Sequence, residues 1–182
     1  LEKPEIRDAI YPISTNLYHE MCDCGILDEN IELIEGMLVK KMPKSPLYTK
    51  VATKLTEFFY KFFTDNFTIR QEQPITIGNS EPEPDISILK KIGESQWNRH
   101  PNTAELVIEI SLTSYNLDKE KANIYALGNI NEYWIVNLNK NELEVYSKPE
   151  NGKYTERKIF QKNAEITIPF SPDHKFNLPE IF

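Results

Sequence analysis

Two acidic side chains stand where the local pattern of the sequence asks for apolar residues. Glu109 interrupts Leu106-Val107-Ile108-Glu109-Ile110, a stretch typical of a strand buried on both faces. Asp85 follows a proline and comes directly before the apolar Ile86-Ser87-Ile88. A buried carboxylate is costly unless a cation or good hydrogen-bond donors meet it. If the two strands are neighbours, both carboxylates project from one sheet face, and a metal ion between them would let both ionise.

A lysine lies on the inward face of the helix predicted after Glu109. Lys121 is four residues from Leu117 and three from Ile124, so it shares their face of that helix. An inward ammonium group requires an anion. One source is local, because Asp118 lies three residues away and could form a salt bridge or a helix cap. The other source is the pair of carboxylates on the sheet.

Two carboxylates and one ammonium group form a set that can cleave a phosphodiester. Hard oxygen ligands suit Mg²⁺ or Mn²⁺. Such an ion polarises a phosphoryl oxygen and lowers the pKa of bound water, while a lysine stabilises developing negative charge. We therefore expect a divalent-metal nuclease in which Asp85 and Glu109 bind Mg²⁺ (or Mn²⁺) and Lys121 stabilises charge.

The elements that must position these residues alternate between helix and strand. The sequence predicts a short helix closed by Gly25, a bent strand or hairpin over 31–39 that turns at Glu35-Gly36, and a long helix entered at Ser45-Pro46. Strands are expected over 67–71, 74–77, 85–89, 105–111, 133–137, 143–146, 154–160 and 166–168, with a helix over 117–127 closed by Gly128. This order is typical of an α/β (α+β mixed) fold with a mixed β-sheet flanked by helices.

Composition limits the class of protein. The chain has 182 residues, of which 40% are hydrophobic and 27% charged. These values predict one folded domain over 1–182 rather than a disordered chain. Its apolar runs fall far short of the about 18 residues that cross a bilayer, so no membrane partner is expected and the location is predicted to be cytoplasmic.

The distribution of charge bears on a nucleic-acid partner. A formal net charge of −7 argues against indiscriminate attraction to nucleic acid. The stretch 37–56 nevertheless carries no acidic residue and five lysines: Lys40, Lys41, Lys44, Lys50 and Lys54. This basic segment is a candidate contact for DNA phosphates. The alternative is a solvated helix face with its preceding loop.

A second group of metal-ligand types occurs near the N-terminus. His19, Cys22 and Cys24 could supply three ligands, but a structural zinc site needs four, and the sequence has no second Cys/His cluster to complete it. Cysteines one residue apart are poorly spaced for a disulfide, so free thiols are expected. The favoured interpretation is a short helix with Leu17, Met21 and Cys24 on its apolar face.

The order and spacing of four motifs resemble the Uma-two family of restriction endonuclease-like proteins, a branch of the PD-(D/E)xK nuclease superfamily. Glu32-Leu33-Ile34-Glu35-Gly36 is similar to the family's E-L-I-D-G opening, and Glu83-Pro84-Asp85-Ile86 to its E-P-D-hydrophobic strand. The stretch 106–110 resembles the strand L-V-I-E-V. Residues 114–134 resemble the long pattern S-x3-D-x2-K-x3-Y-A-x-G-x3-E-Y-W. The similarity spans almost the whole chain.

The resemblance implies the restriction-endonuclease core, with Asp85 and Glu109 as metal ligands, Lys121 as the base-like catalytic residue and Glu32 as a helper. In the commonest superfamily pattern the lysine stands two residues after the glutamate, where this chain has Ser111. The amine must then come from Lys121, one helix later. The family also often has a histidine near the start of the second helix, where this chain has Tyr48.

The leading hypothesis is a Mg²⁺-dependent DNA endonuclease or nicking enzyme. The alternative is a catalytically silent module that keeps the nuclease fold and holds nucleic acid or a protein partner. Under either hypothesis the chain could form a homodimer.

Overall fold

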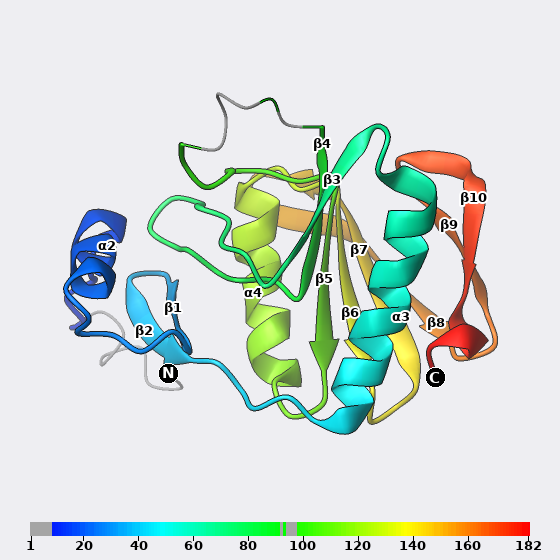
Figure 1. Cartoon of the computed structure of the whole chain (residues 1–182), viewed down its shortest axis with the longest axis horizontal. Helices are drawn as coiled ribbons and strands as arrows, with labels where there is room; N and C mark the ends of the chain where they lie inside the picture. The colour runs from blue at the N-terminus through cyan, green and yellow to red at the C-terminus, as the bar shows by residue number, and fades with distance from the viewer. Residues whose placement is uncertain (1–8, 92, 94–97) are drawn as a thin grey trace.

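The computed structural model describes residues 9–91, 93 and 98–182, and its centre is a six-stranded mixed sheet (Figure 1). The strands of this sheet, in spatial order, are β3 (Phe67–Gln71), β4 (Ile86–Lys90), β5 (Leu106–Ser111), β6 (Glu132–Asn137), β7 (Glu142–Glu150) and β8 (Lys153–Gln161). β5 and β6 are parallel, and the other neighbouring pairs of the sheet are antiparallel. The predicted mixed α/β fold is confirmed.

A long helix covers each face of this sheet. α3 (Pro46–Phe63) packs against a core that includes Ile108 and Trp134, whereas α4 (Tyr115–Leu127) packs against one that includes Val107 and Tyr133 (Figure 1). Successive side chains of a strand point to opposite faces. Glu109 therefore shares the α4 face with Val107.

The strand register sets four residues in one row of the sheet, of which three lie on the α4 face. Glu109 pairs with Ile135, and Ile135 pairs with Glu144. On the other side, β4 and β5 pair Ile86 with Ile108, and continuing this antiparallel register by one residue sets Asp85 opposite Glu109. Glu109 and Glu144, two strands apart, thus lie on the same face of the sheet, and Asp85 lies at the end of their row, where β4 begins.

Both long helices form for the local reasons that the sequence gives. Ser45 is the N-cap of α3 and accepts a hydrogen bond from the backbone N–H of Tyr48, with Pro46 in the first turn. α4 is the crossover that the parallel pair β5 and β6 requires, and it ends at Gly128. The two predicted helices are confirmed, with α4 beginning slightly earlier than expected.

The predicted turn at Glu35-Gly36 is confirmed as a tight hairpin between β1 (Ile31–Ile34) and β2 (Met37–Lys40). Both turn residues have positive φ, 49° and 76°, as a two-residue hairpin turn of this hand requires. A Cβ added to Gly36 would lie 2.5 Å from the Cβ of Pro12, so this position also needs glycine for space. The turn fixes the position of β1, which carries Glu32.

α2 (Thr15–Asp23) forms, but its predicted apolar face is wrong. The buried residue of this helix is Tyr18, whose hydroxyl donates to the carbonyl of Ile31 at 2.8 Å. Leu17 is 45% exposed, Met21 is only half-buried and Cys24 is exposed, because α2 lies at the periphery beside the β1–β2 hairpin instead of packing on a sheet face (Figure 1).

The strand predicted over 74–77 is also wrong. Its backbone N–H groups donate to different segments, that of Ile75 to Pro82 and that of Thr76 to Pro101, so the stretch cannot join a single ladder. Conversely, β10 (Ser171–Asn177) was not expected; it pairs with β9 (Glu165–Ile168) in a separate two-stranded sheet, followed by the short helix η2 (Leu178–Glu180). In the described part of the chain, every helix is too short or too polar to cross a bilayer.

Candidate active site

Asp85 and Glu109 come together where β4 begins beside the end of β5. Asp85 precedes the first paired residue of β4, and its carboxylate lies at the end of the sheet, where it is reached by Tyr48 of α3 as well as by the backbone of β5. Asp85 Oδ2 accepts a hydrogen bond from the backbone N–H of Ile110 at 2.6 Å, which ties this carboxylate directly to the strand that carries Glu109. Glu109 is 4% exposed and Asp85 is half-buried.

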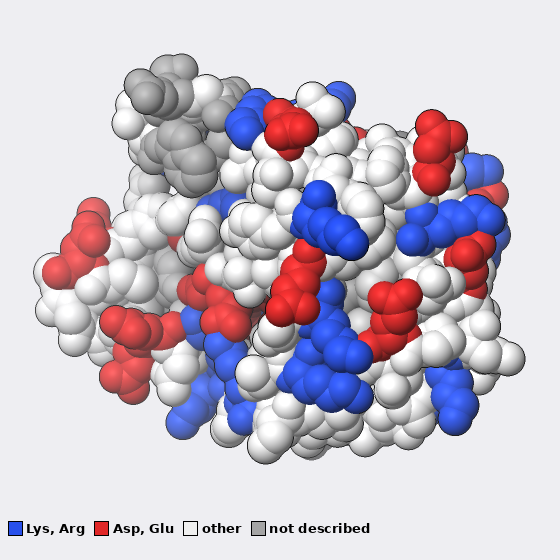
Figure 2. All heavy atoms as spheres, turned by 45° about the vertical axis from the view of Figure 1, so that its right-hand side comes forward, with Lys and Arg blue, Asp and Glu red and all other residues white. Residues whose placement is uncertain are grey.

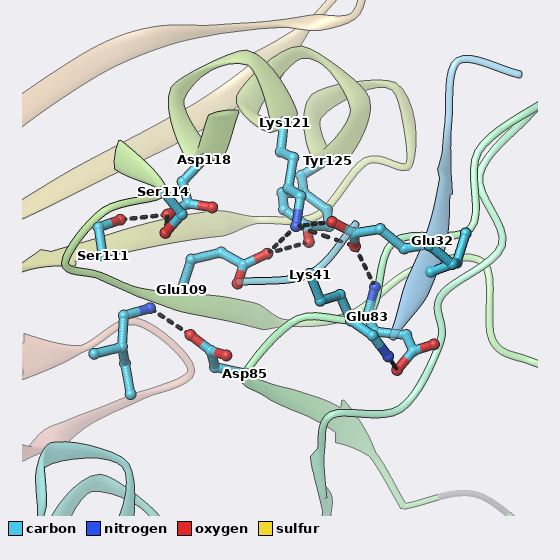
Figure 3. A network of polar contacts seen from close by, with 12 residues as sticks. Glu32, Lys41, Glu83, Asp85, Glu109, Ser111, Ser114, Asp118, Lys121 and Tyr125 are labelled. Carbon is cyan, nitrogen blue, oxygen red and sulfur yellow. Dashed lines mark hydrogen bonds and ion pairs between the residues drawn. The ribbon is translucent and has the colours of Figure 1, made fainter. Parts of the chain in front are cut away.

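Lys121 reaches this pair from α4, and Glu32 reaches it from β1. The ammonium nitrogen of Lys121 lies 3.2 Å from Glu109 Oε1 and 2.9 Å from Glu32 Oε1 (Figure 3). The structure thus brings together all four residues that the sequence marked as catalytic candidates, from four separate segments. The close-up shows the Lys121 side chain descending from the helix between the two glutamates (Figure 3).

The local alternative for Lys121 does not describe what the structure shows. Its ion pairs among the described residues are those with Glu32 and Glu109. Asp118 instead accepts hydrogen bonds from the hydroxyls of Ser111 and Ser114, the latter at 2.6 Å (Figure 3). The commonest superfamily pattern has lysine at the position of Ser111. In this chain the Ser111 hydroxyl donates a hydrogen bond to the carboxylate of Asp118.

Neutral donors hold the carboxylates in place. Tyr125 donates to Glu109 Oε1 at 2.8 Å, and Tyr48, in the first turn of α3, donates to Asp85 Oδ1 at 2.5 Å. The backbone N–H of Glu83 donates to Glu32 Oε2 at 3.1 Å. Both donors to Glu109 reach Oε1, and Oε2 is turned toward Asp85 (Figure 3).

The cluster holds more negative than positive charge. Glu32, Glu109 and Asp118 are buried and Asp85 is half-buried, while Lys121 is the buried lysine among them. Burial raises the pKa of Asp85 to about 7, although the hydrogen bonds from Tyr48 and the Ile110 N–H oppose the change. Without further positive charge, Asp85 and Glu109 therefore favour binding protons.

Glu109 and Lys121 respond to this environment in opposite senses. Burial raises the pKa of Glu109 well above its ordinary value, Lys121 opposes that rise, and the neighbouring Asp85 and Asp118 add to it. For Lys121, burial alone would lower the pKa, but the carboxylates of Glu109 and Glu32 outweigh it and raise the pKa. Lys121 is therefore an ammonium group at neutral pH.

The cluster forms the floor of an open cleft of about 970 Å³. Asp85, Glu109 and Lys121 line it together with the start of α3 and the segment after β2. Of the five lysines of the basic segment, Lys40, Lys41 and Lys44 line this cleft, whereas Lys50 and Lys54 are exposed on α3 outside it.

The basic segment is not a continuous positive surface. Lys41 pairs with Glu83 at 2.7 Å, and Lys44 pairs with Glu72. Lys54 donates to the backbone carbonyl of Glu180. On the face that Figure 2 presents, lysine and arginine side chains are interspersed with acidic ones. The basic segment can therefore contact a phosphate only locally, through its lysines at the rim of the cleft.

Several residues that shape this site have no role predicted from the sequence. Tyr48 was noted only as a departure from the family pattern, yet it holds Asp85. Glu83 and Glu72 were not singled out, although each draws a rim lysine to the cleft. Two signals were available, a tyrosine in the first turn of an otherwise apolar helix face and an alternation of acids before Asp85.

Comparison with known proteins agrees with this architecture. A family model, Uma2, described as "Putative restriction endonuclease", matches residues 16–178. The crystal structure of a putative nuclease belonging to DUF820 from Anabaena variabilis superposes with a TM-score of 0.77 at 17% sequence identity, over 94% of this chain and 98% of that one. At this identity the superposition shows a shared fold. No curated protein matches the sequence.

Proposed function

Because the chain belongs to the Uma2 family, we propose that it hydrolyses phosphodiester bonds of DNA with a divalent cation held by Asp85 and Glu109. Family and structural neighbour both support a nuclease-like function. The observation that carries the finer proposal is the excess of carboxylates over ammonium groups on the floor of the cleft.

The donor set fits Mg²⁺ or Mn²⁺. Both ions prefer carboxylate oxygens, and Mg²⁺ keeps several waters, which an open cleft provides. Glu109 Oε2 is turned toward Asp85, so the two carboxylates are disposed to share an ion (Figure 3). When bound, the cation would supply Lewis-acid polarisation of the phosphoryl group and a lowered pKa for water.

Lys121 acts in this proposal as a fixed positive charge. The neighbouring carboxylates raise the pKa of Lys121 and keep its amine protonated in the metal-free chain, which favours charge stabilisation over the base-like role that the family resemblance implies. An ammonium group held at the floor of the cleft stabilises negative charge that develops on the phosphate. Glu32 keeps Lys121 in place by accepting its second ion pair.

Tyr48 positions Asp85. Burial and the adjacent Asp85 carboxylate raise the pKa of Tyr48, so the hydroxyl stays protonated and donates its hydrogen bond. Together with the Ile110 N–H it fixes both oxygens of Asp85. A carboxylate whose orientation is fixed in this way is prepared to bind an ion without further reorganisation.

The rim lysines supply the contact with DNA in this proposal. Lys40, Lys41 and Lys44 line the same cleft as the carboxylates, so a backbone phosphate on the floor would have neighbouring phosphates at the rim. Lys50 and Lys54 lie on α3 outside the cleft and are not part of this contact.

Relaxation of supercoiled plasmid tests the proposal. Chain freed of metal with a chelator should show no cleavage until Mg²⁺ or Mn²⁺ is added. Asp85→Asn, Glu109→Gln and Lys121→Met should each lower the rate by about 10²–10³-fold or more, the range for removing one electrostatic group from a preorganised site.

Glu144→Gln is the matched control, because it removes a buried carboxylate from the same row of the sheet but outside the cleft. It should cleave at the wild-type rate once folding is verified by circular dichroism. Cleavage that none of the three cleft variants affects would contradict the proposal. DNA binding without any metal-dependent cleavage would favour the silent binding module instead.

A further inference from the structure

A second cluster of ligand-type side chains lies outside the candidate active site. His19 comes from α2, Glu81 from the segment before β4, and His100 from the segment before β5. The ligand atoms of the three residues all lie within 4.8 Å of one another. Three segments far apart in the sequence thus converge on one point.

Both imidazoles present the same nitrogen to the same oxygen. Nε2 of His19 lies 2.7 Å from Glu81 Oε1, and Nε2 of His100 lies 3.9 Å from it. The two rings are steeply inclined, with 64° between their planes and 6.2 Å between centroids. A hydrogen bond to Glu81 needs only one imidazole, so the second one is not explained by pairing alone.

Glu81 is held as metal-binding carboxylates commonly are. It is 2% exposed, and its other oxygen, Oε2, accepts a hydrogen bond from the hydroxyl of Thr76 at 2.6 Å. Its backbone N–H donates to Leu33 at 2.7 Å. Such outer partners fix the orientation of a ligating carboxylate.

From this geometry we propose that His19, Glu81 and His100 bind a zinc-class divalent cation. Two imidazole nitrogens and one carboxylate oxygen suit Zn²⁺ and its transition-metal neighbours, not Mg²⁺, which prefers six oxygen ligands. Ligand atoms of a tetrahedral zinc lie about 3.3 Å apart, given bond lengths of about 2.0–2.1 Å. The separations of 2.7 and 3.9 Å bracket that value, and the half-exposed histidines have room to adjust.

The surroundings fit a site with an open coordination position. The three residues line a hollow of about 800 Å³ together with the charged side chains Asp23, Glu83 and Arg99. The buried Glu81 forms its inner wall, while the side chains of His19 and His100 are 45% and 42% exposed. A water molecule would complete the coordination from the solvent side.

Binding would fasten α2 to the central part of the fold. α2 buries only Tyr18, yet it supplies Tyr18 and Cys22 to the wall of the cleft that holds Asp85 and Glu109. A cation shared by His19 and Glu81 would therefore fix one wall of that cleft. It would do so without contacting the proposed Mg²⁺ ligands.

Titration of the metal-free full chain with Zn²⁺ tests the site, with Co²⁺ absorption as a report on nitrogen and oxygen coordination. We expect one equivalent of Zn²⁺ to bind. His19→Gln and His100→Gln should each weaken it by at least about tenfold. The matched control is His174→Gln, because the chain has three histidines and His174, in β10, contacts Ser171 instead.

Further variants make the outcome decisive. Asp85→Asn should bind Zn²⁺ like the wild type, which separates this site from the proposed catalytic one. Equal affinity in wild type and His100→Gln would overturn the proposal. So would a loss on Cys22→Ser that His100→Gln does not show, since that result would place the ion between His19 and Cys22. Because both histidines are half-exposed, their substitution leaves the core intact, and circular dichroism verifies this.

Discussion

Two buried glutamates in one row of the central sheet have opposite electrostatic environments. Glu109 and Glu144 lie on the same face, beneath α4, with Ile135 between them. Their exposed fractions are 4% and 0%. Both are shielded from solvent, but Glu109 lies deeper in the fold than Glu144, so the two differ in desolvation as well as in the groups that contact each carboxylate.

The carboxylate of Glu144 accepts hydrogen bonds on both of its oxygens. Arg157 donates from Nε at 3.0 Å and from Nη2 at 2.6 Å, and the hydroxyls of Tyr115 and Tyr146 donate as well. Burial alone would raise the pKa of Glu144, but the hydrogen bonds from Tyr115, Arg157 and Tyr146 outweigh it and lower the pKa. This is a structural carboxylate.

Glu109 shares one ammonium group with other carboxylates. Lys121 divides its contacts between Glu109 and Glu32, while Asp85 and Asp118 add negative charge nearby. The pKa of Glu109 rises where that of Glu144 falls. The comparison teaches that low solvent exposure alone does not mark a functional acid; the depth of the carboxylate in the fold and the hydrogen-bond donors and cations around it do.

Removing the positively charged side chain beside each glutamate should produce the largest difference in stability between the two regions. Lys121→Met leaves Glu32 and Glu109 buried without their ammonium partner, so the free energy of unfolding should fall by about 3–5 kcal/mol. Arg157→Met should cost about 1 kcal/mol or less, because Arg157 is 44% exposed and Glu144 keeps both tyrosine hydroxyls. Urea denaturation at pH 7 measures both losses, and equal losses would contradict the comparison.

The second largest difference is expected in how Mg²⁺ stabilises variants of the two glutamates. Mg²⁺ at about 100 times its Kd should stabilise the wild type by about 2.7 kcal/mol. Glu109→Gln should lose this shift and, without metal, unfold at a higher temperature, because it removes one negative charge from a cluster whose carboxylates outnumber its one ammonium group, while Lys121 keeps Glu32 as its partner. Thermal unfolding with and without Mg²⁺ measures both effects.

The control for this measurement is Glu144→Gln. It should lower stability without metal by about 1–3 kcal/mol, because charged hydrogen bonds are lost, and keep the full Mg²⁺ shift. A metal shift of the same size in Glu109→Gln and Glu144→Gln would show that Glu109 is not a ligand.

Much of the fold could be predicted because local signals and tertiary packing agree. The cap at Ser45-Pro46 gave the start of α3, and the Glu35-Gly36 turn gave the hairpin. Where packing decides, the sequence was less informative. The apolar face expected on α2 was wrong because that helix lies beside the hairpin, and only Tyr18 reaches the interior.

The site could be predicted in part for a similar reason. A charge inside an apolar pattern is visible in the sequence, so Asp85, Glu109 and Lys121 could be named and the proximity of the two carboxylates inferred from strand pairing. The pairing of Lys121 with Glu32 could not be inferred from spacing, since Glu32 lies 89 residues away and reaches Lys121 only through the tertiary fold. Tyr48 and the convergence of His19 with His100 likewise depend on long-range packing.

The smallest expected effect concerns the pH dependence of Glu144. Its folded pKa lies below the ordinary value, so its stabilising contribution is complete above about pH 4.3, the pKa of a free glutamate, and is lost as the pH falls through the folded pKa. The difference in unfolding free energy between wild type and Glu144→Gln should therefore shrink between about pH 6 and pH 3. Subtracting the two proteins cancels the titration of the cleft carboxylates, which both contain. Urea midpoints across this range measure the difference, and a difference that grows in acid would mean that the donors around Glu144 do not favour its charged form.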